Sequence, residues 1–127
     1  MPATNFFTSF LETALSRDEI LTEIRLPKVA NAGWSFQKFT LRAQDWAIVG
    51  VAAVRNGTTG VALVNMADTP VLAAGVEAAV ADGASAAEAA SHASDGLEPP
   101  SDVRSSSEYR RHLAAVLVRR ALEEAGA

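Results

Sequence analysis

The fold of this chain is decided by the stretch from Trp46 to Gly57, which reads WAIVGVAAVRNG. Its first ten residues form a nearly continuous apolar run, too hydrophobic for the edge of a sheet, which predicts a strand over Trp46 to Arg55. Asn56-Gly57 is the strongest short hairpin signal in the sequence, because both residues accept the positive φ angles of a tight turn. The chain is therefore expected to return in an antiparallel strand over Gly60 to Met66.

Two more strands are predicted upstream of this hairpin. The segment from Glu19 to Leu26 alternates roughly between apolar and polar residues and stops at Pro27, as a half-buried strand would. In the following segment, Trp34, Phe36 and Lys38 fall on one face of a strand. The order of these segments predicts three to four antiparallel strands.

Helices are predicted after the strands. Thr69 and Pro70 suit the cap and first position of a helix that Gly83 would end. Two later pairs have the spacing of a capping box: Ser85 with Glu88, and Ser105 with Glu108. The first pair opens a short helix, and the second opens the longest one, over about residues 106 to 125. Strands followed by helices predict an α+β fold, a three- to four-stranded antiparallel sheet followed by three helices packed on one face.

Composition limits the function. The 127 residues fit one domain and include no cysteine, which excludes disulfides, thiolate metal sites and a cysteine nucleophile. The net charge of −4 and the lack of a basic stripe argue against a nucleic-acid partner. The longest apolar run is far shorter than the roughly 18 to 20 residues that cross a bilayer, and the first residues do not resemble a signal peptide. We therefore expect a soluble, cytoplasmic protein without a membrane span.

Most candidate catalytic residues have a simpler interpretation. His92 and His112 lie on separate predicted helices, neither with a carboxylate at ligand spacing, so no metal site is predicted. The Arg110-Arg111 and Arg119-Arg120 pairs are expected to be solvated and paired with Glu108, Glu123 and Glu124. No glycine-rich nucleotide-binding motif and no nucleophile elbow is present.

Two features leave alternatives open. Lys38 stands mid-strand among aromatic residues, where it either extends to water or offers a fixed cation to an anionic ligand. The cluster of Phe6, Phe7, Phe10 and Leu11 is unusual in a small acidic protein. These side chains either fold back on the domain's own core or mark an edge where another domain or chain belongs.

Several segments together resemble a known family. They are Phe6-Phe7-Thr8-x-Phe10, Glu19 to Ile24, Gln37-Lys38-Phe39, Arg42 to Ala52, and Tyr109 to Leu122. In this order and spacing they resemble the flavoprotein (medium) subunit of molybdenum hydroxylases, above all that of the carbon monoxide dehydrogenase type. The resemblance covers nearly the whole chain.

The resemblance implies a division of the chain and a cofactor. Residues 1–18 would be a remnant of the end of an FAD-binding domain, and residues 19–127 the C-terminal flavoprotein domain. Leu21 matches a family position that contacts FAD, and Lys38 matches a lysine near the isoalloxazine ring. The glycine-rich loops that grip the FAD pyrophosphate belong to the missing N-terminal FAD-binding domain. FAD is thus expected in the intact subunit and not on this chain alone.

The resemblance also implies partners. In the family, electrons pass from a molybdopterin large subunit through an iron–sulfur small subunit to FAD. The chain would then be part of an oxidoreductase, closing the FAD site without being catalytic by itself. Two alternatives stay open at this stage: a stand-alone protein-interaction module, and a truncated product without flavin or catalysis.

Overall fold

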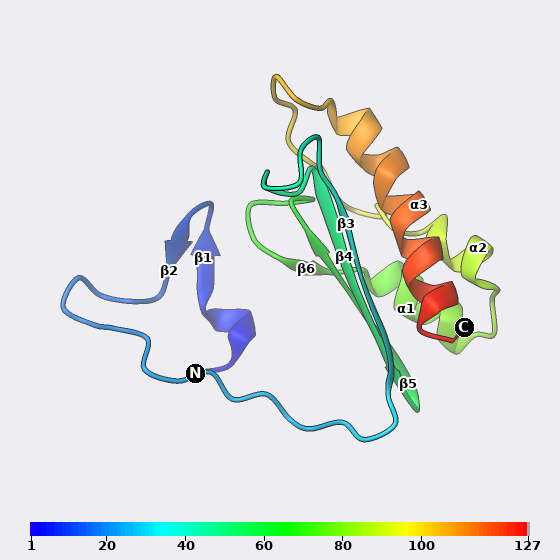
Figure 1. The fold of residues 1–127 in the computed structure, drawn as a ribbon, viewed down its shortest axis with the longest axis horizontal. Helices are drawn as coiled ribbons and strands as arrows, with labels where there is room; N and C mark the ends of the chain where they lie inside the picture. Colours follow the sequence, from blue (N-terminus) through cyan, green and yellow to red (C-terminus); the bar gives the residue numbers. More distant parts are fainter. Residues whose placement is uncertain (127) are drawn as a thin grey trace.

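The computed structural model describes residues 1–126, and two unlike regions make up the molecule. From Gly33 onward the chain folds into a sheet with helices on one side. The first 32 residues extend away from the other side of that sheet (Figure 1). Within residues 1–126, no helix is long and apolar enough to cross a membrane.

The main sheet has four strands in the order β3-β4-β5-β6, and every neighbouring pair is antiparallel. The strands are β3 (Gly33–Phe39), β4 (Val49–Asn56), β5 (Thr58–Val64) and β6 (Val71–Leu72). The apolar stretch quoted above supplies β4, which lies between β3 and β5 as its composition predicts. The hairpin at Asn56-Gly57 is confirmed, with Gly57 at a φ of 75°.

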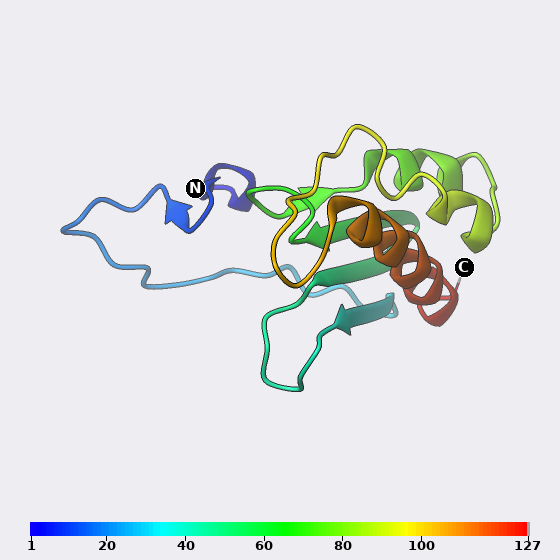
Figure 2. The same ribbon diagram turned by 90° about the horizontal axis from the view of Figure 1, so that it is seen from above.

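Three helices cover one face of the sheet: α1 (Ala74–Ala81), α2 (Ala86–Ala90) and α3 (Ser107–Glu124). Viewed from above, all three lie on the same side (Figure 2). Gly83 follows α1 with a φ of 87°, as expected for a helix stop. The capping box of Ser85 and Glu88 is present at the start of α2. The α+β architecture predicted from the sequence is therefore confirmed.

The core lies between the sheet and the helices. Side chains of β4 and β5 that point to the helices are fully buried, among them Val49, Val51, Val61 and Leu63. Small residues of the helices pack against them, so the alanine-rich sequence brings helix and sheet close together. Gly33 shows the closest approach, because a Cβ atom there would lie 2.1 Å from the carbonyl oxygen of Ala125.

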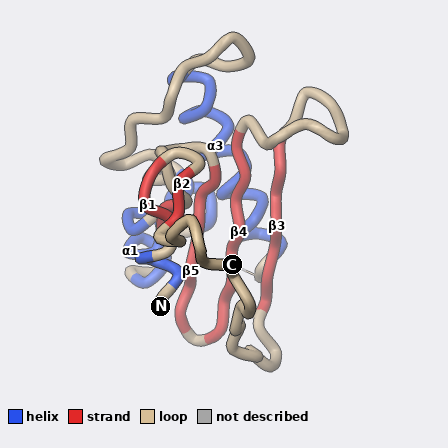
Figure 3. Tube along the Cα trace, turned by 90° about the vertical axis from the view of Figure 1, so that its left-hand side faces the viewer, coloured by secondary structure: helices blue, strands red, loops and turns tan. Residues whose placement is uncertain are grey.

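The N-terminal region consists of a short helix, a small hairpin and an extended segment. The elements are η1 (Ala3–Asn5), β1 (Phe7–Ser9) and β2 (Glu12–Thr13), and β1 pairs with β2. Residues 14–32, which we call the arm, form no helix or strand. Seen from the hairpin side, β1 and β2 lie in front of the main sheet, and β3 and β4 stand uncovered beside them (Figure 3).

The strand predicted over Glu19 to Leu26 is wrong, because this segment belongs to the arm. Its apolar side chains, Ile20, Leu21, Ile24 and Leu26, are all exposed. A strand needs a neighbour for its backbone hydrogen bonds. Within residues 1–126 no strand pairs with this segment, so the alternating pattern does not produce a strand.

Several boundaries also differ from the prediction. The central strand starts at Val49 rather than Trp46, and the return strand spans Thr58–Val64 rather than Gly60 to Met66. The predicted helix start at Thr69-Pro70 is wrong, because Val71 and Leu72 pair with β5 as β6 before α1 begins. The long helix is capped by Ser106, whose hydroxyl accepts a hydrogen bond from the Tyr109 N–H, one residue later than predicted.

Candidate functional site

The face of the sheet turned away from the helices is largely uncovered and apolar. We call it the open face, and its large exposed side chains are Trp34, Phe36, Val54, Val64 and Leu72. Trp34 is 68% exposed and Leu72 is 61% exposed, far above what a strand facing a core allows. A monomeric soluble protein rarely presents so many large apolar side chains together. The open face is therefore a candidate contact surface.

The register of the strands gives this surface its shape. Phe36 lies opposite Ala52, Lys38 opposite Gly50, and Ala52 in turn opposite Ala62. The middle of the open face thus carries small residues, and the large ones flank them on β3, on β6 and at the ends of β4 and β5. This arrangement leaves a shallow floor between larger side chains.

Lys38 belongs to this surface. It is exposed on β3, on the same face as Trp34 and Phe36, as the alternation in the sequence predicts. Within residues 1–126, no carboxylate lies within ion-pair distance of its ammonium group. The open face therefore carries an exposed positive charge beside aromatic rings.

Leu21 belongs to the arm. The arm as a whole runs on the side of the sheet away from the helices (Figure 1). Leu21 is half-exposed and lines a hollow formed by the arm and the N-terminal hairpin, together with Phe6 and Phe7. Phe7, Phe10 and Leu11 are exposed, so the phenylalanine cluster does not fold back into the core. The first interpretation of this cluster, packing on the domain's own core, is therefore wrong for these side chains.

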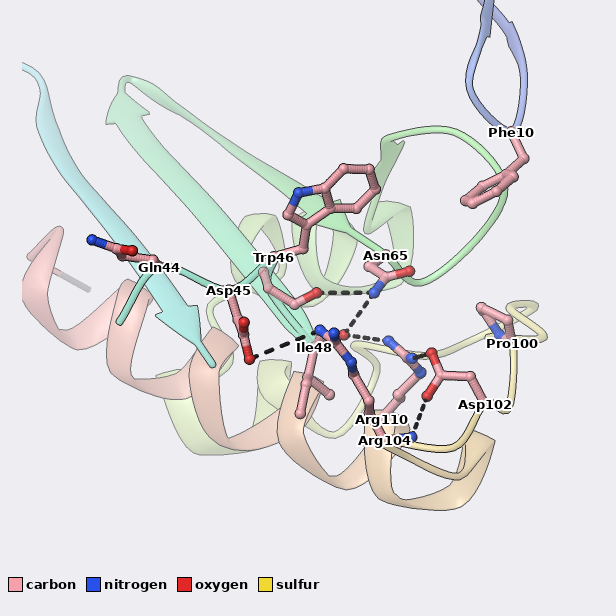
Figure 4. A pocket seen from close by; sticks show the side chains of 11 residues that line it. Phe10, Gln44, Asp45, Trp46, Ile48, Asn65, Pro100, Asp102, Arg104 and Arg110 are labelled. Atoms are coloured by element: carbon pink, nitrogen blue, oxygen red, sulfur yellow. Dashed lines mark hydrogen bonds and ion pairs between the residues drawn. The ribbon is translucent and has the colours of Figure 1, made fainter. Parts of the chain in front are cut away.

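A second hollow lies at the end of the sheet where the loop between β3 and β4 meets the start of α3 (Figure 4). Trp46, Asp45, Asn65 and Asp102 are among its lining residues. Arg110 of α3 lies at its base and is only 1% exposed. The expectation that Arg110 is solvated is wrong: its Nη2 pairs with Asp102 Oδ2 at 2.6 Å, and its Nη1 donates to the Ile48 carbonyl.

The carboxylate of Asp102 is held in its charged form. The Arg104 backbone N–H donates to it at 2.8 Å, and this bond is the main reason why the pKa of Asp102 is lowered. The Ser105 N–H and the charges of Arg110 and Arg104 act in the same direction, while partial desolvation opposes them. Asp102 therefore remains a charged partner for Arg110 at neutral pH.

The other candidates behave as surface groups, with one correction. His92 does have a carboxylate nearby, because its Nδ1 lies 2.7 Å from Asp95 Oδ2. His112 stacks on Tyr109. Among the residues that the structure describes, no group of three or more His, Asp or Glu side chains is placed to hold a metal ion. Arg119 approaches Glu123, so this part of the predicted arginine pairing is confirmed. Arg111 pairs instead with Glu98, which the sequence did not indicate as a partner.

A large exposed apolar sheet face is typical of an interaction site. Comparison with known families identifies the class of domain: residues 34–125 match the CO dehydrogenase flavoprotein C-terminal domain. The chain belongs to this family, and it corresponds to the C-terminal domain of the medium subunit of molybdenum hydroxylases.

Individual relatives agree over the full chain. It is 33% identical to the carbon monoxide dehydrogenase medium chain of Hydrogenophaga pseudoflava, covering 100% of this chain and 48% of that one. It is 31% identical to the nicotine 6-hydroxylase medium subunit of Paenarthrobacter nicotinovorans, covering 98% and 47%. The chain thus spans about half the length of the curated relatives it matches.

Solved structures give the same result and include the N-terminal region. The carbon monoxide dehydrogenase of Hydrogenophaga pseudoflava superimposes with a TM-score of 0.84 at 34% identity, over 98% of this chain and 47% of that one. The quinoline 2-oxidoreductase of Pseudomonas putida 86 superimposes with a TM-score of 0.81 at 30% identity, over 96% and 46%. Because nearly all of the chain is covered, the extended N-terminal region belongs to the shared fold.

Sequence reasoning missed the buried state of Arg110 and the pairing of His92. The Asp at position 95, three residues after His92, was a visible signal for the latter. For Arg110, the one available signal was its place one helical turn before Leu113 and Ala114 on α3, a place that an arginine can also occupy with an exposed tip.

Proposed function

We propose that this chain closes an FAD site whose pyrophosphate-binding part lies outside these 127 residues, in a part that we call the FAD-binding half. The observation that carries the proposal is the open face, an apolar surface on which Lys38 is exposed and, within residues 1–126, has no carboxylate partner. The sequence of β4 supports it. A strand that alternates between core and water carries polar residues at every second position, whereas β4 is apolar on both faces until Arg55.

Lys38 is the residue proposed to act on the flavin. FAD bound in such a site would supply two-electron and one-electron chemistry, with negative charge growing on its ring system when reduced. The ammonium group of Lys38 is exposed and within residues 1–126 has no carboxylate partner, so it is free to face that charge. A fixed cation at that place favours the reduced state of the ring and orients it.

Leu21 and the hairpin are proposed to form a second contact. Residues 1–18 would complete the end of the FAD-binding half, and Leu21 would lie against the cofactor from the arm. Exposed Phe7, Phe10 and Leu11 support this, because these side chains gain apolar contact only when a second body packs against them.

The wider pathway follows from the family. The intact assembly would pass electrons from a molybdopterin large subunit, through an iron–sulfur small subunit, to FAD and then to an acceptor. The substrate would be chosen by the large subunit. This chain carries no glycine-rich phosphate loop, so its part in that pathway is to cover and tune the flavin.

The test is flavin retention. The chain is mixed with FAD alone, and with FAD plus the part of the Hydrogenophaga pseudoflava medium chain that precedes the matched region. After desalting, the absorbance between about 350 and 500 nm measures bound flavin. We expect the chain to raise the flavin retained by that half, and Lys38→Met to weaken FAD binding about tenfold, the size of one charged contact. Retention that is no greater with the chain than without it would contradict the proposal.

A further inference from the structure

We propose that Arg110 is a positioning residue that fixes the loop between β3 and β4, and with it the end of β3 that carries Lys38. The loop runs from Thr40 to Ile48 and closes through one backbone hydrogen bond, from the Ile48 N–H to the Phe39 carbonyl at 2.8 Å. Lys38 is the residue next to Phe39. The inference deepens the proposed function and rests on it where the flavin is concerned.

Contacts from two parts of the fold, α3 and the turn after β5, converge on the closing end of this loop. The Arg110 Nη1 of α3 donates to the Ile48 carbonyl. The Asn65 Nδ2, from the turn after β5, donates to the Ala47 carbonyl at 2.9 Å and to the Ile48 carbonyl at 3.3 Å. Asn65 itself adopts a left-handed backbone with a φ of 63°, which asparagine tolerates better than most residues.

The residue before Arg110 holds the other side of the loop base. The ring of Tyr109 meets the ring of Phe39 edge-on, with centroids 6.4 Å apart. Two consecutive residues of α3 therefore contact Phe39 and Ile48, the two residues that close the loop (Figure 4 shows Arg110 and Ile48). The position of Lys38 relative to the helix layer is set by this pair.

Stability alone does not account for an arginine here. Its guanidinium is buried, and its Nε has no hydrogen-bond partner among the described residues. An apolar side chain of similar volume would avoid this desolvation, so replacing such a group is often neutral for stability. The Ile48 carbonyl would still keep the Asn65 amide. An apolar residue, however, cannot bond to both the Ile48 carbonyl and Asp102. Arg110 does so, and it thereby links the loop to the segment before α3.

Asp102 offers a selective way to break that link. Its Oδ1 accepts the backbone N–H groups of Arg104 and Ser105, while its Oδ2 accepts from Arg110. Asp102→Asn keeps an oxygen for the two backbone groups and turns an amide group toward the guanidinium. Glu98→Gln is the matched control, because Glu98 pairs with the exposed neighbour Arg111.

The experiment uses the fluorescence of Trp46 to measure the mobility of the loop. Trp46 lies within the loop and is 72% exposed. Trp34→Phe removes the other indole of the chain. In this background, emission anisotropy and acrylamide quenching of Trp46 are measured for Arg110→Met, Arg110→Lys, Asp102→Asn and Glu98→Gln. We expect lower anisotropy and stronger quenching in the first and third variants, partial rescue by lysine, and no change in the control. The unfolding midpoint in urea shows that each variant is folded.

A second measurement, of FAD binding, separates this inference from the proposed function. With the FAD-binding half present, Asp102→Asn is expected to weaken FAD binding about tenfold through displacement of Lys38, and Glu98→Gln to leave it unchanged. An unchanged Trp46 signal in both Arg110→Met and Asp102→Asn would overturn the positioning role, whatever the flavin does. If the unaltered chain fails to improve FAD retention while Trp46 responds, the proposed function fails and the loop contact stands.

Discussion

The two faces of the main sheet are made by the same strands, but one face is buried and the other is exposed. On the face toward the helices, Val51 and Leu63 are fully buried. On the open face, Val54 and Leu72 come from β4 and β6 and are exposed. Alternate residues of one strand therefore differ in surroundings and hardly in polarity. Both faces of the sheet are hydrophobic in sequence, but within residues 1–126 only the face toward the helices is covered.

The difference between the two faces can be tested most directly by replacing one leucine on each. Leu63→Ala removes a side chain buried between sheet and helices and is expected to lower the free energy of unfolding by about 3 kcal/mol. Leu72→Ala removes one from the open face and is expected to cost less than about 1 kcal/mol. Urea unfolding of both variants measures the difference. Equal losses would mean that the open face is packed in solution.

A pair of glycines sharpens the same contrast. Gly33→Ala places a Cβ atom against the Ala125 carbonyl oxygen and is expected to cost about 2 kcal/mol. Gly60→Ala, with no atom within 4 Å of the new Cβ, is expected to be neutral or stabilising by up to about 1 kcal/mol. The shift of the thermal midpoint checks both. A harmless Gly33→Ala would show that the end of α3 does not pack against β3.

Asp102 predicts a pH dependence at the end of the sheet. Hydrogen bonding to the backbone N–H of Arg104 lowers the pKa of Asp102 in the folded state. A carboxyl with a lowered folded pKa stabilises the protein above its unfolded pKa, and this contribution disappears as the pH falls through the folded value. Thermal midpoints of the original chain and of Asp102→Asn should therefore differ at neutral pH and converge in acid.

Other acidic groups do not disturb that comparison. The pKa of Glu88 is also lowered, by hydrogen bonds from the Ser85 side chain and backbone, but Glu88 titrates in both proteins and cancels in the difference. A gap between the two midpoints that stays constant into acid would show that the charge of Asp102 plays no part.

The smallest effect is expected for Lys38→Met. Its ammonium group is exposed, so the substitution should change the free energy of unfolding by no more than about 0.5 kcal/mol. Denaturant unfolding of the isolated chain measures this. A large loss would mean that Lys38 is buried and paired on the open face, which would remove it from any site for an external group.

Much of this architecture could be predicted from the sequence. The apolar run of β4, the Asn56-Gly57 turn and the capping box at Ser85 are local signals, and each works within a few residues. The alternation of Trp34, Phe36 and Lys38 also placed Lys38 correctly on the open face. These features depend on neighbours in the chain, which a sequence displays.

What failed depends on partners far along the chain. Glu19 to Leu26 has the pattern of a strand, but a pattern cannot show whether another strand is present to pair with it. Val71 and Leu72 form β6 only because β5 offers them an edge. Arg110 is buried through contacts with Ile48 and Asp102 that no spacing in α3 reveals. Leu21 and Lys38 as flavin contacts come from resemblance to the family and stay predictions.

The central claim is that the open face is the surface that the FAD-binding half covers. Trp34 lies on that face, and in a Trp46→Phe variant it is the only indole of the chain. Its emission is recorded while the FAD-loaded half is added, with complex formation followed by size-exclusion chromatography. If the FAD-loaded half covers the open face, the Trp34 indole becomes buried, and its emission is expected to be quenched and shifted to shorter wavelength. A complex that forms while the Trp34 emission stays unchanged would contradict it.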